Sequence, residues 1–329
     1  MKAVWKINKN ALLAMTLAAV GIALTASEAW AQGISPVVWN KNSFTYDDGQ
    51  APSVAVSGSV IVEVHEGNSG SLWSHTGTIQ ENGTVTWATG AFQYDNGYAP
   101  SIAISGNNVI EVHQAGSGEG VLWYRTGTIT SAGTVTWATE SSQYDNGLAP
   151  SVAVAGQTVV EVHQAGAGVG ALYYRAAEMQ ANGTVVWNRN SYQYDNGTAP
   201  SVAIAGSTVI EVHQAGTTEG PLYYRAAEIR ANSSVVWAKS SFLYTNGLAP
   251  SISASGPTAV EVHQEGSGVG SLWYRTARLE ATGKVEFATS SFQYDSGEAP
   301  RLTVVGPTIL EVHESTTGVG PLYYRTAAY

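Results

Sequence analysis

A glutamate, a histidine, an aromatic residue and an arginine recur together along this chain, in copies of a unit of about 50 residues. In one copy Glu161 and His163 alternate along a strand-like segment, so both side chains point to the same face. Tyr173 and Arg175 have the same spacing on the segment that follows. Charged groups of both signs can bind adjacent sugar hydroxyls in two-pronged fashion, while an aromatic ring packs on the apolar side of the sugar. Repetition of such sites along one chain would make weak binding avid.

The predicted ligand-binding residues come from the copies that keep all four residue types. In the first copy His75 takes the place of the arginine. The predicted set is Glu111, His113, Trp123, Arg125, Glu161, His163, Tyr173, Arg175, Glu211, His213, Tyr223, Arg225, Glu261, His263, Trp273, Arg275, Glu311, His313, Tyr323 and Arg325.

The same residues have a structural alternative, in which they stabilise the packing between repeats. A glutamate buried between packed faces is costly unless it is paired. If a hairpin pairs His163 with Tyr173, Arg175 falls opposite Glu161 and can form a bidentate ion pair with it. A register slipped by one residue would place the two sets on opposite faces. The first copy shortens the intervening loop by an even number of residues, which keeps every side chain on its face and favours a fixed register.

We predict no catalytic residues, no metal ligands and no cofactor. One substrate requires one set of acid, base and nucleophile, and therefore a site that differs from the average copy. A Glu-x-His pair offers fewer metal ligands than the usual three or four. The residues that depart from the repeat fall in different copies and form no recognisable acid–base pair; they are Asp48, His75, Thr245 and Arg301.

Four short strands in each unit must position these side chains. In one copy the strand-like segments are 151–155, 158–164, 172–179 and 184–194, because they are rich in β-branched and aromatic residues. Ala-Gly, Gly-rich, Asn-Gly and Asp-Asn-Gly stretches follow them and predict turns. Four antiparallel strands in about 50 residues match the size of a propeller blade.

The offset between the ends of the chain predicts a closed ring. Residues 37–46 copy the fourth strand of a unit, whereas residues 322–329 copy the third. Pairing between them would complete the last blade and leave no open sheet edge. We therefore predict an all-β fold, a six-bladed β-propeller of four-stranded blades closed by the N-terminal strand pairing with the last blade. A linear solenoid is the alternative.

Aromatic residues recur once per unit in the fourth strand and are predicted to form the core between blades. The Asp and Asn of the Asp-Asn-Gly turns are expected to bond their own backbone, and a turn tolerates the Thr245 replacement. The predicted core residues are Trp39, Trp87, Trp137, Trp187, Trp237 and Phe287.

The first 31 residues have the pattern of a secretory signal peptide, with lysines before an apolar run and Ala-Trp-Ala at the cleavage site. The propeller is therefore predicted over residues 32–329, in a secreted monomer that is extracellular or periplasmic. Losing this leader would change the net charge from −10 to about −12. Such a charge argues against nucleic acid or an anionic membrane as partner, and no membrane insertion is expected after cleavage. The chain has no cysteine, so burial and strand pairing must stabilise it.

With its blade number and its Arg, Glu and aromatic set, the sequence resembles the six-bladed propeller lectins, such as the fungal fucose-binding family. Its Glu-Val-His-Gln and Leu-Tyr-Tyr-Arg segments are similar to repeats of secreted bacterial proteins of uncharacterised role. The resemblance implies a multivalent lectin-like protein whose partners are glycans or cell-surface polymers.

Two alternatives to a lectin stay open. The first is a structural or protein-interaction propeller without small-ligand sites. The second is a polysaccharide hydrolase acting at the central channel, in which an outlier such as His75 or Arg301 matters more than its equivalents. The Ser-x-Asp-x-Gly-x-x-Trp box of sialidases is absent from the sequence.

Overall fold

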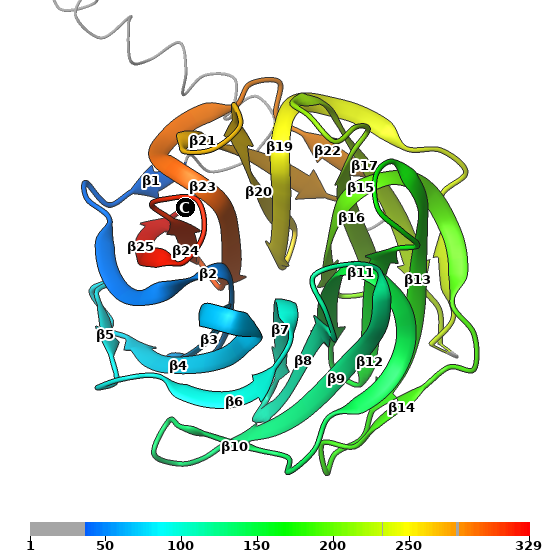
Figure 1. Ribbon diagram of the computed structural model, residues 1–329. Helices are drawn as coiled ribbons and strands as arrows, with labels where there is room; N and C mark the ends of the chain where they lie inside the picture. Colours follow the sequence, from blue (N-terminus) through cyan, green and yellow to red (C-terminus); the bar gives the residue numbers. More distant parts are fainter. Residues whose placement is uncertain (1–36, 232, 281–282) are drawn as a thin grey trace, which may run out of the picture.

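Six antiparallel sheets follow one another around a central channel (Figure 1). The structure, a computed structural model, describes residues 37–231, 233–280 and 283–329. We number the blades in chain order, so that blade 1 contains β3 (Val60–Glu66) and blade 6 contains β24 (Thr308–Glu314). The prediction of an all-β, six-bladed propeller is confirmed. The predicted signal peptide lies outside the described residues, and within them no helix is long and apolar enough to cross a bilayer.

Each blade has an inner strand beside the channel, two middle strands and an outer strand. The strands that form outer and inner edges are β2 (Phe44–Ser57), β6 (Phe92–Asn96), β7 (Tyr98–Ser105), β11 (Ser142–Ala155), β15 (Tyr192–Ala205), β19 (Phe242–Ser255) and β23 (Phe292–Val305). The second strand of each blade, counted from the channel, is β3 in blade 1 and β24 in blade 6. In blades 2 to 5 it is β8 (Asn108–Gln114), β12 (Thr158–Gln164), β16 (Thr208–Gln214) and β20 (Thr258–Glu265). The third strands are β4 (Ser71–Ile79), β9 (Gly120–Ile129), β13 (Gly170–Met179), β17 (Gly220–Ile229), β21 (Gly270–Leu279) and β25 (Gly320–Ala328). Short outer segments are β1 (Val38–Trp39), β5 (Val85–Trp87), β10 (Val135–Trp137), β14 (Val185–Trp187), β18 (Val235–Trp237) and β22 (Val285–Phe287), and a 3-10 turn spans Asn68–Gly70.

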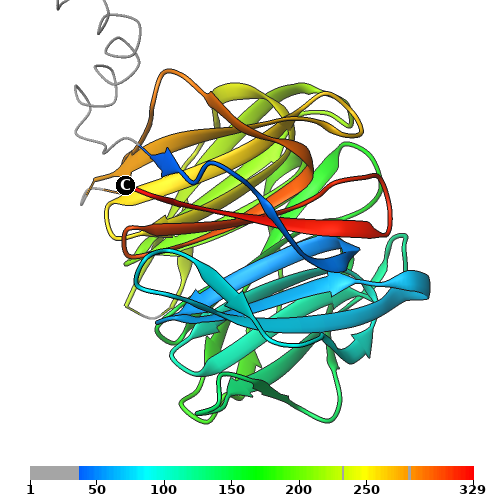
Figure 2. The ribbon, with the colours of Figure 1, turned by 90° about the vertical axis from the view of Figure 1, so that its left-hand side faces the viewer.

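The N-terminal segment closes the ring as predicted. Val38 pairs with Ala328, and further along Phe44 pairs with Tyr324, so β1 and the first half of β2 form the outer strand of blade 6. Figure 2 shows this N-terminal segment in blue alongside β25 in red. The second half of β2 then pairs with β3 as the inner strand of blade 1. One strand therefore joins the last blade to the first.

The predicted Asp-Asn-Gly turns are corrected by the structure, because the chain stays extended there. Asp145 and Gly147 still pair with β9 of blade 2, the chain changes partner to β12 at Leu148, and an irregularity follows between Leu148 and Ser151. Ala149, within this irregularity, has a φ of 46°, in the left-handed region that residues with a Cβ seldom adopt. The backbone before this irregularity pairs with β9 and the backbone after it pairs with β12, so the segment forms no turn. The predicted strand over 184–194 is likewise divided, into β14 and the start of β15.

A stack of aromatic rings lies between each pair of neighbouring blades, which confirms the predicted core. Tyr144 of the blade 2 outer strand stacks on Trp187 of blade 3 with ring centroids 4.5 Å apart. At the closure Trp39 stacks on Tyr294 at 4.2 Å. Fully buried aliphatic side chains such as Val160 and Leu172 fill the space beside these rings. The remaining stacked pairs are Tyr46–Trp87, Tyr94–Trp137, Tyr194–Trp237 and Tyr244–Phe287.

Candidate active site at the channel mouth

The glutamate and histidine of each repeat are buried between blades. Glu161 has no exposed surface, and His163 is 2% exposed. Nδ1 of His163 lies 3.0 Å from Oε2 of Glu161, and the hydroxyl of Tyr144 in the preceding blade donates to Oε1 of Glu161 at 3.0 Å. Burial raises the pKa of Glu161; burial alone would lower the pKa of His163, but the Glu161 carboxylate holds it above its usual range. The equivalent pairs are Glu63–His65, Glu111–His113, Glu211–His213, Glu261–His263 and Glu311–His313.

The arginine of the repeat pairs with an aspartate of the preceding blade. The predicted register is confirmed, because Glu161 is opposite Arg175 and His163 is opposite Tyr173. The predicted ion pair between Glu161 and Arg175 is wrong, since Nη1 of Arg175 lies 3.3 Å from Oδ2 of Asp145 instead. The glutamate already has its histidine and tyrosine partners, whereas the longer arginine side chain reaches the neighbouring outer strand.

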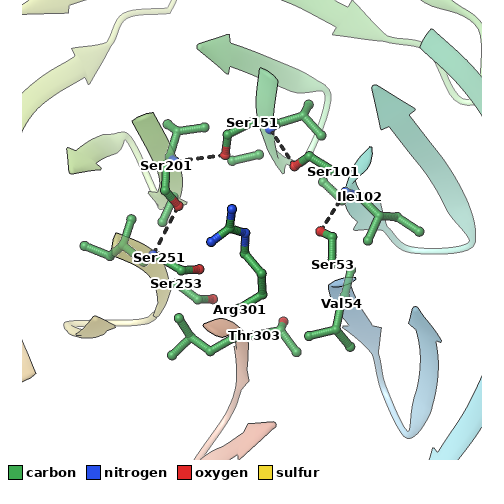
Figure 3. A pocket seen from close by; sticks show the side chains of 18 of the residues that line it. Ser53, Val54, Ser101, Ile102, Ser151, Ser201, Ser251, Ser253, Arg301 and Thr303 are labelled. Carbon is green, nitrogen blue, oxygen red and sulfur yellow. Dashed lines mark hydrogen bonds between the residues drawn. The ribbon is translucent and has the colours of Figure 1, made fainter. Parts of the chain in front are cut away.

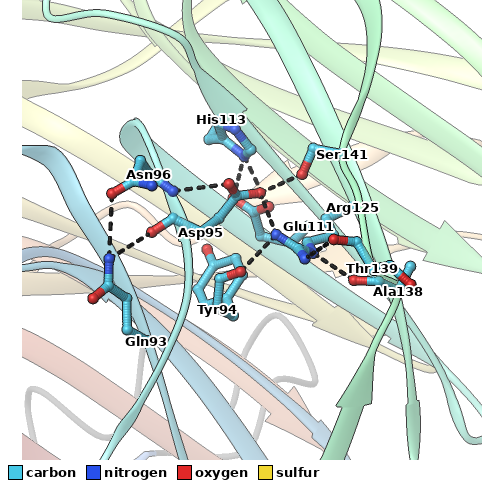
Figure 4. A network of polar contacts seen from close by, with 10 residues as sticks. All are labelled: Gln93, Tyr94, Asp95, Asn96, Glu111, His113, Arg125, Ala138, Thr139 and Ser141. Carbon is cyan, nitrogen blue, oxygen red and sulfur yellow. Dashed lines mark hydrogen bonds and ion pairs between the residues drawn. The ribbon is translucent and has the colours of Figure 1, made fainter.

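Figure 4 shows the same arrangement between blades 1 and 2. Nη1 of Arg125 lies 2.8 Å from Oδ2 of Asp95, and its Nε and Nη2 donate to the carbonyls of Ala138 and Thr139 at 2.8 and 2.7 Å. Asp95 also accepts hydrogen bonds from Ser141 and from the amide of Asn96. The arginine donors are thus engaged in joining two blades. Equivalent ion pairs are Arg225–Asp195 and Arg325–Asp295.

Two repeats change this ion pair. On the outer strand of blade 4, Thr245 replaces the aspartate, and no carboxylate of the described residues lies within ion-pair distance of Arg275 in blade 5; burial lowers the pKa of Arg275. We expected a turn to tolerate Thr245. The structure shows that the substitution also removes an ion pair. In blade 1, His75 replaces the arginine, and its Nδ1 lies 2.7 Å from Oδ2 of Asp47. Nε2 of His75 is 2.9 Å from the Ala88 carbonyl.

We expect His75 to make the stability of the fold depend on pH. Burial would lower the pKa of His75, but its hydrogen bonds to Asp47 and Ala88 raise it. Its contribution is therefore complete below the ordinary histidine pKa of about 6.5 and is lost as pH rises through the higher folded-state pKa. Burial would raise the pKa of Asp47, but the hydrogen bond to His75 lowers it, so that the aspartate contribution is lost only in acid.

The test compares the wild-type protein with His75→Arg, which carries the residue of the other repeats. Between about pH 5.5 and 8.5 the wild-type protein should lose about 1 kcal/mol more stability than the variant, as thermal unfolding would show. The variant controls for the other histidines, which it retains. Equal pH slopes in the two proteins would contradict the assignment.

In blade 6, three of the predicted binding residues border an open hollow of about 540 Å³. They are His313, Tyr323 and Arg325, and residues 41–44 of the closing segment form the opposite side. Nη1 of Arg325 lies 3.0 Å from Asp295, and its other nitrogens donate to backbone carbonyls. The guanidinium of Arg325 and the carboxylate of Asp295 at this hollow are therefore already paired with each other.

The central channel holds a different set of polar groups. Ser53, Ser101, Ser151 and Ser201 stand at equivalent positions on successive inner strands and line a cavity of about 260 Å³ (Figure 3). In blade 6 this position is Arg301, whose side chain extends into the ring of serines. Nη1 of Arg301 donates to the carbonyl of Pro300 at 3.0 Å.

Two glutamates of blade 6 lie opposite each other in the sheet, next to residues that line this channel. Glu298 at the start of the inner strand is opposite Glu314 at the end of β24. Oε1 of Glu314 accepts the amide of Ala51, a channel-lining residue of blade 1, at 2.7 Å. Burial, with a further contribution from the neighbouring Glu298, raises the pKa of Glu314 to about 7, against the opposing effects of the Ala51 amide and Arg301. Oε1 of Glu298 is buried and has no hydrogen-bond partner among the described residues.

In blade 1 the same pair of positions holds a single carboxyl group. There Gln50 stands opposite Glu66, and its side-chain amide donates to Oε2 of Glu66 at 2.8 Å. In blades 2 to 5 a glutamine occupies the position of Glu314; for example, Gln164 accepts the amide of Ala199 at 2.8 Å. The acidic pair is thus a departure from the repeat that accompanies Arg301.

The sequence analysis singled out Arg301 but missed Glu298 and Glu314. The signal was present in the alignment of the repeats, where only the last copy combines Glu at both positions with Arg301. No group of three or more His, Cys, Asp or Glu residues in the described part of the chain could hold a metal ion. Two carboxyl groups near a guanidinium are a combination that can transfer protons.

Solved structures similar to this chain include Trypanosoma rangeli sialidase in complex with the inhibitor DANA, with a TM-score of 0.54, and a mutant of this sialidase that displays trans-sialidase activity, with a TM-score of 0.55. Each is 10% identical, and the match covers 88% of this chain and 59% of the sialidase, so the chain spans less than two thirds of those proteins. A putative 6-phosphogluconolactonase from Bacteroides uniformis matches with a TM-score of 0.52 and 13% identity, over 75% of this chain and 72% of its own. At these identities the likeness shows the propeller fold alone. No protein-family model matches the chain, and no curated protein matches it.

The predicted lectin-like function is wrong. The structural neighbours reported above are named as enzymes, not as lectins. The physical reason for the error is that the repeated Glu, His and Arg residues, which suggested sugar-binding pockets, are engaged in contacts between blades. The repeated Glu, His and Arg residues therefore have the alternative role considered above, which is to stabilise the packing between repeats.

Proposed function

We propose that this protein is a hydrolase whose acid–base pair is Glu298 and Glu314 at the channel mouth of blade 6. The observation that carries the proposal is the apposition of two carboxyl groups, one with a pKa of about 7 and the other with an oxygen that has no partner among the described residues. Pairs of carboxyl groups whose environments separate their pKa values are a common basis for acid–base catalysis.

The proposed reaction is hydrolysis of a glycosidic bond in a polysaccharide. Protonated Glu314 donates its proton to the leaving oxygen as the bond to the sugar carbon breaks, and Glu298 takes a proton from the attacking water. The Ala51 amide holds one oxygen of Glu314, so the other oxygen is available to carry the transferable proton. The likeness of the fold to that of a sialidase supports the proposal to the extent that a propeller of this type can hold a glycoside-cleaving site.

The test measures hydrolysis of a panel of polysaccharides and chromogenic glycosides by wild-type protein and Glu314→Gln. Loss of a general acid should lower the rate by about 100-fold or more. The wild-type rate should fall about tenfold per pH unit above pH 7, because the pKa of Glu314 is about 7 and only the protonated form acts.

Glu66→Gln is the matched control, because Glu66 occupies the same position in blade 1 opposite a glutamine. Both variants introduce the residue of blades 2 to 5, so both should fold, as circular dichroism would show. Similar activity in Glu314→Gln and wild-type protein would overturn the proposal, as would equal losses in the two variants.

A further inference from the structure

Four serines that line the channel accept a backbone amide, and no hydrogen bond donated by their hydroxyls is found among the described residues. The amide of Ile102 donates to Oγ of Ser53 at 3.2 Å, and the amide of Val152 donates to Oγ of Ser101 at 3.1 Å. A serine hydroxyl has two lone pairs and one proton, so an amide that occupies a lone pair leaves the proton free to donate. The same bonds join Val202 to Ser151 and Ile252 to Ser201, so hydroxyl protons are available around the channel (Figure 3).

Arg301 adds a cation to this ring of donors. Glu314 attracts its guanidinium, but none of the described carboxylates lies within ion-pair distance of it. A guanidinium has no acceptor atom, so Arg301 cannot accept the amide of Val54, as the serines do for the equivalent amides of later blades. Serine hydroxyls, a guanidinium and an amide therefore meet at one place.

The chemistry of the cavity selects an anion with several oxygen atoms. Hydroxyl and guanidinium donors that have no carboxylate partner among the described residues are complementary to a carboxylate or a sulfate, and arginine binds both in two-pronged fashion. Burial lowers the pKa of Arg301, an effect that a bound anion would oppose. The cavity volume of about 260 Å³ is just below the range of about 300–1,000 Å³ for whole-ligand pockets, and so it suits a single charged substituent.

We propose that the channel of this propeller is an oxyanion-binding subsite, in which Arg301 and the surrounding serines hold a carboxylate or sulfate substituent of the substrate. The proposal rests on the hydrolase function given above, whose acid–base pair lies in the same blade as Arg301. It names the substrate class as an acidic polysaccharide, and it assigns to Arg301 a binding role that the equivalent serines of the other blades cannot perform alone.

The direct test is calorimetric titration of the whole chain with sodium sulfate and with glucuronate, at constant ionic strength set with sodium chloride. Wild-type protein should bind one anion per chain, and Arg301→Ser should bind it at least about tenfold more weakly. The serine variant carries the residue of the other blades, so it is expected to fold. Arg230→Ser removes the same charge from an exposed position and should bind as wild type does.

Absence of saturable binding in wild-type protein, or equal binding in Arg301→Ser, would overturn the subsite. Binding of free sulfate but not of glucuronate would assign the site to sulfate groups, and the reverse result would assign it to uronic acids. The catalytic proposal fails separately, because anion binding by Glu314→Gln can be measured even when no substrate is hydrolysed. Conversely, if Arg301→Ser hydrolysed acidic substrates at the wild-type rate, the proposed subsite would be wrong, whereas the proposed acid–base pair would be unaffected.

Discussion

Removal of the closing strand, by starting the chain at Gln50, is expected to destabilise the whole ring. The truncation deletes the ring of Trp39 that stacks on Tyr294 and the strand pairing with β25. It also deletes the backbone carbonyls that accept from Arg325 and leaves β25 with an open edge. Loss of an aromatic core residue together with a strand should cost at least about 4 kcal/mol, a large part of the stability of a typical domain. Chemical denaturation followed by tryptophan fluorescence measures this loss.

A circular permutant is the matched control for the truncation. It starts at Gln50 and carries residues 37–49 after Tyr329, joined through a copy of the five-residue loop 180–184 that connects the same strands in blade 3. It retains the deleted strand but not the original position of the chain ends. We expect it to unfold cooperatively near the wild-type midpoint. A truncated chain as stable as the permutant would show that closure contributes little.

Glu161→Ala is expected to be among the most destabilising single substitutions in the chain. It removes the acceptor for His163 and for Tyr144 in an environment where Glu161 itself has no exposed surface. Breaking a buried polar pair by removing one partner typically costs about 3–5 kcal/mol. The measurement is the free energy of unfolding in urea at pH 7.

Glu178→Ala provides the comparison, because Glu178 lies on β13 of the same blade but is exposed. It should change stability by no more than about 0.5 kcal/mol. Comparable losses in the two variants would mean that the network between blades does not stabilise the fold as described.

The sequence was sufficient to predict the ring, because both its closure and its register follow from repeat arithmetic. The even difference in loop length around His75 kept the faces aligned, and the offset ends identified the strand containing Trp39 as the missing outer strand of blade 6. These are properties of strand order and side-chain alternation, which a repeated sequence displays directly.

Partners that come from another blade could not be predicted in this way. Arg175 lies opposite Glu161 in the sheet, but its ion pair is with Asp145, on a strand that the sequence analysis interpreted as a turn. Glu314 was missed because Glu in place of Gln at one repeat position looks conservative by itself. Its altered pKa arises from burial and from Glu298 across the strand pair, so the two positions had to be considered together.

The continuous strands that pass from one blade to the next have a consequence for how such a protein can evolve. Strand β11 ends one blade and begins the next without a linker, and β15, β19 and β23 do the same. Unequal crossing-over between two successive strands of the set β11, β15 and β19 would delete or duplicate a unit that contributes one whole blade to the ring. The genetic change would leave the closing strand and the blade that carries Arg301 intact. Blade number in this architecture can therefore vary by recombination independently of the residues at the channel mouth.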